Sequence, residues 1–146
     1  MTEQKRWLDL LEQNGGRLTA PRKAIVELLV NSNRALGPVE IYDLVRKQNP
    51  KVGLVTVYRT LELLGRLGLV ERIHLPDGCH MILRAARGHE HAVLCTGCGR
   101  AEYFPGEDIS DWIAHISRES GFTIQSHWLQ LQGLCGDCQR LKEKVA

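Results

Sequence analysis

The chain has 146 residues, of which 43% are hydrophobic and 25% are charged, and its formal net charge is +2. These proportions are typical of a soluble globular protein. The sequence contains no run of about 18 apolar residues, and its polar start lacks the apolar region of a signal peptide, so it predicts neither a membrane span nor secretion. We therefore expect a cytoplasmic protein whose thiols stay reduced.

Charge is divided unevenly between the two halves of the chain. Residues 1–84 carry 13 basic and 9 acidic side chains, a net charge of +4, whereas residues 85–146 carry 6 and 8, a net charge of −2. A basic half joined to an acidic half fits a DNA-contacting module followed by a second unit. Many enzymes show such an imbalance, so charge alone does not select this interpretation.

The first half of the chain predicts four helices. Apolar residues recur at helical spacing at about 4–13, 20–32 and 54–67, and between the helix-starting Gly37-Pro38 and the helix-ending Asn49-Pro50. Thr19 is a good N-cap for the second helix, and Pro21 is acceptable in its first turn. The hydrophobic spacing then changes from that of helices to that of strands.

Two strands follow the helices, at 69–74 and 79–83, and Pro76-Asp77-Gly78 between them is a hairpin turn signal. Several helices followed by a two-stranded hairpin indicate a winged helix-turn-helix. In that arrangement the last helix enters the major groove of DNA and the hairpin lies beside it. A plain helical bundle with an added hairpin is the alternative.

Four residues are candidates for reading DNA. They are Arg17, before the second helix, and Thr56, Tyr58 and Arg59 on the fourth. Arginine bonds the O6 and N7 atoms of guanine, and tyrosine packs on a thymine methyl group or bonds a phosphate. The alternative is a solvated helix face, for which the β-branched and aromatic residues of Val55–Thr60 would be unusual.

The second half predicts a small α/β unit after a short linker at Ala85–Gly88. We expect strands at about 91–95 and 101–104, a helix at about 107–120, and a long strand at about 122–133. The whole chain is therefore an α+β protein. Its predicted parts are a winged-helix DNA-binding domain at 1–84, a hinge at 85–90, and a small metal-binding domain at 91–146.

Two Cys-x-x-Cys pairs, Cys95/Cys98 and Cys135/Cys138, are the most specific motif in the chain. Four thiolates bind Zn²⁺ tetrahedrally, and two residues between ligands let a tight turn present both sulfurs to one ion. We expect a closed, structural zinc site that joins the ends of the small domain, with Gly97, Gly99 and Gly136 supplying backbone freedom. A rubredoxin-like iron site is the rival, while a thioredoxin-like redox pair lacks its βαβ context.

A second group of potential metal ligands flanks the linker and comprises Cys79, His80, His89, His91 and His127. His89 and His91 lie two residues apart, so on a strand their side chains point to the same side. Cys79 and His80 are neighbours and point to opposite sides, and His127 is predicted on the apolar side of its strand. A metal held here would bridge the two domains; independent surface or core histidines are the alternative.

At these residues the chain resembles the Fur family of metal-responsive repressors, over nearly its whole length. The matching segments are Arg17–Arg22, the recognition-helix signature Gly53–Leu61, His89-Glu90-His91 followed by Cys95/Cys98-Gly99, and the Cys135/Cys138 pair. The resemblance implies a homodimer formed through the C-terminal domain, with a structural zinc and a regulatory divalent metal near the hinge. It also implies that the regulatory metal sets the two winged helices to fit a palindromic operator in double-stranded DNA.

The resemblance further implies roles for single residues. Tyr58 and Arg59 would touch bases, and Arg17 would reach into a minor groove. The chain also departs from the family pattern in several ways: no His occurs in Asn33–Leu36, Leu83 and Arg84 replace a common Glu or Cys ligand, and Tyr103 stands where an acidic residue is usual. Glu71 matches a position used by some zinc sensors, but it lies at the opposite end of the predicted hairpin from Cys79.

The hypothesis from the sequence is a non-enzymatic, zinc-responsive repressor of the zinc-uptake regulator type. A soft thiolate together with imidazoles favours Zn²⁺ over Fe²⁺ or Mn²⁺ in the second site. An iron- or peroxide-responsive member of the family, with Fe or Mn in that site, is the main alternative. A metal-dependent hydrolase would need an open zinc position and a general base, and no dedicated base is evident. A zinc-storage protein that never touches DNA is a further class.

Overall fold

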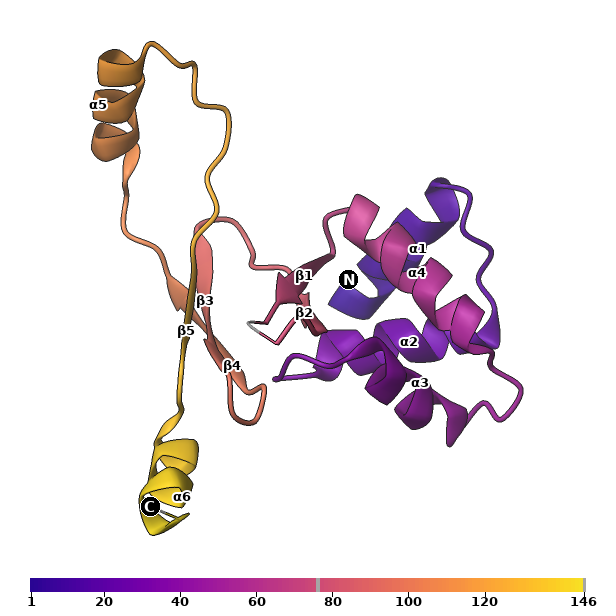
Figure 1. Cartoon of the computed structure of the whole chain (residues 1–146). Helices are drawn as coiled ribbons and strands as arrows, with labels where there is room; N and C mark the ends of the chain where they lie inside the picture. The colour runs from indigo at the N-terminus through magenta and orange to yellow at the C-terminus, as the bar shows by residue number, and fades with distance from the viewer. Residues whose placement is uncertain (76, 146) are drawn as a thin grey trace.

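The computed structural model describes residues 1–75 and 77–145, which form a helical domain and an extended C-terminal domain joined next to a two-stranded wing (Figure 1). The first domain contains α1 (Glu3–Gln13), α2 (Ala20–Asn31), α3 (Pro38–Arg46) and α4 (Leu54–Arg66). These bounds agree with the four predicted helices to within one or two residues. The agreement follows from strong apolar periodicity and clear end signals.

The helices pack around one hydrophobic core. Their apolar sides meet in the centre of the domain, and the largest side chains there are almost fully buried: Trp7, Leu11, Ile25, Leu29, Ile41 and Leu64. Threonine hydroxyls cap two of the helices, since Thr2 Oγ1 accepts from Lys5 N at 3.2 Å and Thr19 Oγ1 accepts from Arg22 N at 3.4 Å. The helical domain therefore has a closed core of its own.

The wing consists of β1 (Val70–His74) and β2 (His80–Arg84), which pair antiparallel from Val70 opposite Arg84 to His74 opposite His80. Its two faces are buried against different neighbours. Val70 and Ile82 join the core of the helical domain, whereas Ile73 and Leu83 join a second hydrophobic cluster with residues of the C-terminal domain. The predicted turn residue Pro76 lies outside the described residues, while Gly78 at φ 83° supplies a left-handed turn position.

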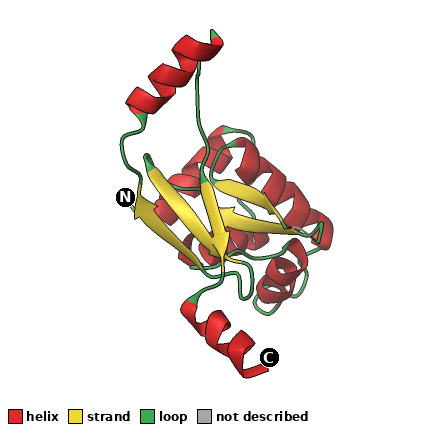
Figure 2. Ribbon diagram, turned by 60° about the vertical axis from the view of Figure 1, so that its left-hand side comes forward, coloured by secondary structure: helices red, strands yellow, loops and turns green. Residues whose placement is uncertain are grey.

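The C-terminal domain is built on a three-stranded sheet in the order β4-β3-β5. β3 (Glu90–Cys95) pairs antiparallel with β4 (Ala101–Pro105) and parallel with β5 (Gln130–Gly133). In Figure 2, the strands of this sheet lie close to those of the wing, and one helix lies beyond each end of the three-stranded sheet. The predicted winged helix followed by a small α/β domain is confirmed.

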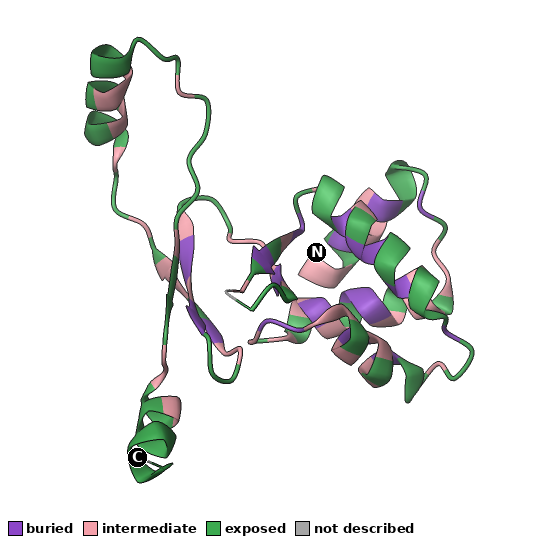
Figure 3. Ribbon diagram, viewed as in Figure 1, coloured by how far each residue is buried: buried purple, intermediate pink, exposed green. Residues whose placement is uncertain are grey.

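Two helices project from this sheet: α5 (Ser110–Ser120) and α6 (Gly136–Val145). Neither contains a buried residue, and Figure 3 shows α6 mostly exposed and α5 exposed apart from partly covered residues on one side. The predicted strand at 122–133 is wrong in length, because only Gln130–Gly133 finds a partner in the short β3. The sequence also placed the start of α5 too early and missed α6. Within the described residues, no helix is long and apolar enough to span a membrane.

The connector between α2 and α3 links the two domains. Leu36 forms both backbone hydrogen bonds of a bridge with Ile82 in the wing, at 2.9 and 2.7 Å. On its other side, the amide of Ala35 donates to the carbonyl of Gly99 at 2.7 Å, and the amide of Ala101 donates to the carbonyl of Asn33 at 2.9 Å. The connector therefore lies between the wing and the sheet of the C-terminal domain.

Candidate metal sites and nucleic-acid interface

The four predicted zinc ligands converge. The sulfur atoms of Cys95, Cys98, Cys135 and Cys138 all lie within 4.8 Å of one another. The Cys98 and Cys135 sulfurs are 3.8 Å apart, which matches the roughly 3.8 Å expected for two thiolates bound tetrahedrally to one zinc at about 2.3 Å. Among the described residues, no other group of three or more Cys, His, Asp or Glu ligand atoms is so compact. The cluster is a four-cysteine metal site.

The sheet brings the two cysteine pairs together across 36 intervening residues. Cys95 ends β3 and lies in parallel register with Gly133 of β5, so the next turn of the chain delivers Cys135 to the same place. The amide of Cys135 donates to the Cys95 sulfur at 3.3 Å. Cys138 follows in the first turn of α6, whose formation therefore helps to complete the site.

Two glycines of the first pair's turn have distinct roles. A Cβ at Gly97 would lie 2.9 Å from the Cys138 sulfur, so a side chain there would displace a ligand. Gly99 has φ +78°, the left-handed region that favours glycine. Gly136 is not among the glycines with positive φ, and an added Cβ there would meet only Arg140 Nη1, at an ordinary contact distance of 3.5 Å. The prediction that Gly136 supplies backbone freedom is therefore wrong, since the helix can start there with other residues.

The environment of the sulfurs differs within the cluster. Burial opposes ionisation of Cys95, but amide hydrogen bonds from Cys135, Cys98 and Gly97 outweigh it and lower the pKa of this thiol to about 6. Hydrogen bonding to Cys135 and Cys95 raises the pKa of Cys138 to about 12. Without metal, Cys95 therefore ionises more readily than an ordinary thiol and Cys138 less readily, and a bound cation would favour the thiolate form that ligation requires.

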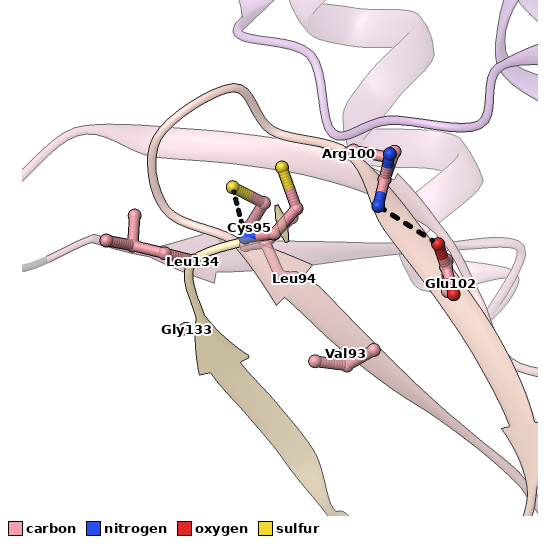
Figure 4. Close-up of a pocket in the computed structure, with 8 residues that line it drawn as sticks. Val93, Leu94, Cys95, Arg100, Glu102, Gly133 and Leu134 are labelled. Atoms are coloured by element: carbon pink, nitrogen blue, oxygen red, sulfur yellow. Dashed lines mark hydrogen bonds and ion pairs between the residues drawn. The ribbon is translucent and has the colours of Figure 1, made fainter. Parts of the chain in front are cut away.

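A cavity of about 170 Å³ lies beside the cluster, between β3, β4 and the end of β5 (Figure 4). Arg100 lies at its edge, with one guanidinium nitrogen 3.4 Å from Glu102 and another 3.5 Å from Asp137 in α6. These exposed ion pairs link β4 to the helix that carries Cys138. They contribute to orientation more than to stability, since solvent screens them.

A second cavity, of about 300 Å³, lies at the hinge. Its lining includes Glu71 from the wing, His89 just before β3, His91 in β3, and His127 from the segment before β5. The rings of His91 and His127 have centroids 5.9 Å apart, and the Trp128 indole donates to Glu71 Oε2 at 3.2 Å. The hinge residues share this cavity without converging as tightly as the cysteines do.

His91 is the most buried of these side chains, with only 7% of its surface exposed. Its ring lies beside Gly106, where an added Cβ would come within 2.5 Å of His91 Nε2. The Gly106 amide also donates to the carbonyl of His89 at 2.6 Å, which ties the end of β4 to both histidines. His127, expected on the apolar side of a strand, instead lies outside β5 and is exposed.

The structure does not bring Cys79 and His80 to the hinge cavity. His80 faces His74 across the far end of the wing, three residue pairs from Glu71, or roughly 10 Å along the strands. Cys79 is exposed beside the turn, and its hydrogen bond with Asp77 raises the pKa of the thiol. The resemblance to zinc sensors pointed to Glu71, but only the fold brings this wing residue to the same cavity as His89, His91 and His127.

The four candidate DNA-reading residues lie at the surface of the helical domain. Arg17, Tyr58 and Arg59 are exposed and Thr56 is half-buried, while Val57 and Leu61 on the same helix face the core. Val55, which the sequence reasoning did not select, is 62% exposed. An exposed β-branched residue at the start of this helix suits contact with a thymine methyl group.

Comparison with known proteins gives consistent matches. Residues 13–132 match the Ferric uptake regulator family. The chain is 32% identical to the ferric uptake regulation protein of Campylobacter jejuni, over 97% of this chain and 91% of that protein. It is also 32% identical to the zinc uptake regulation protein of Mycobacterium tuberculosis, over 86% and 96%. The fold resembles the Helicobacter pylori ferric uptake regulator, with a TM-score of 0.72 at 21% identity over 94% and 95% of the two chains.

Proposed function

Because the chain belongs to the Fur family of metal-responsive, DNA-binding transcription regulators, which are not enzymes, we propose that it is a zinc-responsive repressor that binds a palindromic operator as a homodimer. The observation that carries this proposal is the hinge cavity. It collects Glu71 from the wing and His89, His91 and His127 from the C-terminal part of the chain. A divalent metal bound there would hold residues of both domains at once.

This arrangement supports the proposed domain boundaries. Residues 1–84 end with the wing, 85–90 form the hinge, and 91–146 form the metal-binding and dimerisation domain. A metal that binds more tightly to the DNA-competent orientation raises DNA affinity by the same factor, by linkage. A coupling of about 1–3 kcal/mol, or about 5- to 150-fold, is typical of such systems.

Zinc is proposed as the sensed metal on the basis of the donor set. Three imidazoles and the Glu71 carboxylate would supply four ligands, which suits the tetrahedral preference of Zn²⁺, while the Glu90 carboxylate, which also lines the cavity, accepts from the amide of Arg87. The soft-thiolate argument for zinc does not apply to the hinge cavity, because Cys79 is not among the residues that line it. An iron- or manganese-binding site is therefore the alternative, since imidazoles and carboxylates also bind these metals. One relative is named a zinc uptake regulation protein, and another a ferric uptake regulation protein.

DNA recognition is proposed for α4 and the segment before α2. Tyr58 and Arg59 would contact bases, Thr56 would bond the backbone or a base edge, and Arg17 would reach into the minor groove. Their exposure supports these roles. The four residues belong to a half of the chain with a net charge of +4, which attracts phosphates over longer distances.

A second copy of the chain is the proposed cover for the C-terminal domain. The apolar side chains left exposed there are Trp112 on α5, Phe122 and Trp128 in the following segment, and Leu129 and Leu131 beside or in β5. β5 is also a sheet edge, paired on one side only. An 11-residue helix with nothing buried is marginal in water, so α5 needs such a partner.

Metal titration of purified protein tests the regulatory site. The four-cysteine site should fill first, and a second equivalent of Zn²⁺ should then bind and raise the affinity for operator DNA selected from random sequence. His91→Ala and Glu71→Gln should lose or weaken the second event. Cys79→Ser and His80→Ala are the matched controls, because their side chains lie outside the cavity, and they should retain it. Equal operator affinity with and without Zn²⁺ would refute the proposal.

The same protein loaded with Fe²⁺ discriminates the peroxide-sensing alternative. Iron that reacts with peroxide oxidises its own ligands, so mass spectrometry should then find one added oxygen on His89 or His91. A protein that binds Fe²⁺, gains no oxygen and responds to iron in DNA binding would be an iron sensor. A response to Zn²⁺ alone supports the proposal made above.

A further inference from the structure

The turn that carries the first cysteine pair touches the DNA-binding domain directly. Its residues, Cys95 to Arg100, form a tight loop in which the amide of Gly99 donates to the carbonyl of Cys95 at 2.9 Å and the amide of Cys95 donates to the carbonyl of Arg100 at 2.8 Å. The loop thus holds two metal-ligating sulfurs on one side. On its other side, it offers backbone groups to the connector between α2 and α3.

Two hydrogen bonds join this loop to the connector. Ala35 N donates to Gly99 O at 2.7 Å, and Ala101 N donates to Asn33 O at 2.9 Å, so that Arg34 and Arg100 form an antiparallel bridge. The next connector residue, Leu36, turns its amide the other way and bonds Ile82 in the wing. Four residues of connector therefore join the wing to the sheet of the C-terminal domain by continuous backbone hydrogen bonding.

Apolar side chains also pack around the contact between the connector and the loop. Ala35 is fully buried in a cluster with Ile73 and Leu83 of the wing and Leu94 and Ala101 of the C-terminal sheet. This cluster is separate from the core of the helical domain, so its burial depends on how the two domains sit against each other. The amides of Ala35 and Ala101 belong to buried residues of this cluster, so their hydrogen bonds are costly to leave unmade.

Gly99 is fitted to this contact in two ways. Its φ of +78° is disfavoured for residues with a Cβ, and an added Cβ would lie 2.9 Å from the carbonyl oxygen of Ala35. The neighbour that must move is backbone, which cannot rotate away. Any side chain at this position would therefore strain the loop and push the connector away from it.

We infer that the first cysteine turn is a clasp that positions the DNA-binding domain, so that metal at the four-cysteine site sets domain orientation as well as holding its own domain together. The clasp is defined as the bonds of Ala35 with Gly99 and of Asn33 with Ala101. It acts through backbone groups and is distinct from the hinge cavity. The inference extends the proposed function, because it concerns the orientation on which metal-dependent DNA binding would depend.

Amide hydrogen exchange tests the clasp without using DNA or the hinge metal. Gly99→Ala in the zinc-loaded protein should make the Ala35 and Ala101 amides exchange about tenfold faster or more, as loss of a hydrogen bond plus backbone strain allows. The Leu36 and Ile82 amides in the wing bridge should change less. Gly121→Ala is the matched control, since Gly121 has φ +75° with nothing within 4 Å of the added Cβ. Unchanged Ala35 exchange in Gly99→Ala, or equal changes in both variants, would overturn the clasp.

A second variant breaks the clasp from the other side. Ala35→Pro removes the donor to Gly99 and leaves the cysteine turn untouched, so it applies even where Gly99→Ala reduces zinc binding. The Ala101 amide should again lose protection, with zinc content unchanged. Protection of Ala101 equal to that of the unaltered protein would contradict the inference.

Coupling to the metal is tested with Cys138→Ser, which removes a ligand outside the clasp loop. Loss of zinc should expose the Ala35 and Ala101 amides while amides of the helical core stay protected. If zinc is lost and Ala35 remains protected, the metal does not control the clasp. These outcomes are independent of the proposed function, which fails separately if the unaltered protein shows no metal-dependent DNA binding.

Discussion

The helical domain and the C-terminal domain are stabilised by different means. The first buries Trp7, Leu11, Ile25 and their neighbours in a closed core, whereas α5 and α6 of the second bury nothing. A domain of roughly 60 residues is marginal on its own core, and a metal or a second chain commonly supplies the deficit. The C-terminal domain, which carries the metal ligands, is therefore also the domain whose fold depends on a metal or a second chain.

Removal of the structural metal should produce the largest effect. Cys98→Ser leaves three thiols, and structural zinc sites contribute about 10–16 kcal/mol of binding free energy to folding. We expect the C-terminal domain to lose its structure while the helical domain remains folded. Zinc content, far-UV circular dichroism and limited proteolysis measure this, with a protected fragment ending near residues 85–90.

The outcome that would contradict this division is cooperative loss of both domains. It would mean that the wing, whose Ile73 and Leu83 pack on the C-terminal sheet, needs that contact to stay folded. Cys79→Ser is the matched control, because this exposed thiol lies outside the cluster, and it should change neither zinc content nor proteolysis.

The difference between the two domains also explains which parts of the fold the sequence could predict. The helices of the first domain have strong periodicity and local end signals such as Thr19, so their bounds were predicted closely. The strand expected at 122–133 failed because alternation at Leu129 to Gln132 says nothing about partners, and β3 offers only four positions to pair. α6 was missed because its sequence is mostly polar and its role is to present Cys138.

The sites follow the same pattern. The cysteine cluster was predictable because each pair is a local motif and zinc chemistry requires them to meet. The hinge cavity was only partly predictable, since Glu71 and His89 come together through packing of the wing against the C-terminal sheet. The predicted hairpin put Glu71 and Cys79 at opposite ends, but spacing in the sequence carries no information about the packing that decides which end lies at the cavity.

Substitution of one tryptophan in each domain should give the next largest effects. Trp7 is 1% exposed, whereas Trp112 is 62% exposed. Trp7→Ala should destabilise the helical domain by about 3–5 kcal/mol, because it leaves a cavity in a packed core. Trp112→Ala should leave the unfolding of that domain unchanged and raise the dimer dissociation constant by about ten- to a hundredfold.

Chemical denaturation of the helical domain and analytical ultracentrifugation separate these two results. A loss of helical-domain stability in Trp112→Ala would show that α5 packs on its own chain. Dimer dissociation unchanged by Trp112→Ala would remove this residue from the proposed interface. Phe122 is exposed in the segment that follows α5, so Phe122→Ala serves as a second probe of that surface.

Substitutions on α4, the proposed recognition helix, should have a smaller effect, confined to DNA binding. Tyr58→Ala and Arg59→Ala each remove an exposed side chain and should weaken operator binding by about 1–3 kcal/mol without changing metal content or stability. Electrophoretic mobility shift or fluorescence anisotropy at fixed salt measures the affinity. Glu62→Gln, exposed one turn further along α4, is the control for a general charge effect. Unchanged affinity in both variants would remove α4 from the interface.

Helix capping in the first domain gives a still smaller effect. Thr19→Ala removes the oxygen that accepts from Arg22 N and should cost about 1 kcal/mol of unfolding free energy. Because the threonine hydroxyl is neutral, this contribution should be the same at pH 7 and pH 4. Thermal unfolding at the two pH values measures it, and a difference between them would show that charge contributes to the cap.

In the C-terminal domain, a carboxylate just before α5 accepts hydrogen bonds at the start of that helix, so its contribution should respond to pH. Asp108 accepts hydrogen bonds from the amide and hydroxyl of Ser110 at the start of α5, and these bonds lower the pKa of Asp108 below its usual 3.8. A depressed pKa means that the contribution is present above about pH 4 and is lost as pH falls through the folded-state value. Carbonyl NMR titration should find the lowered pKa and fraying of α5 at the acid end. Asp108→Asn should abolish the pH dependence, since its amide oxygen accepts the same bonds without titrating.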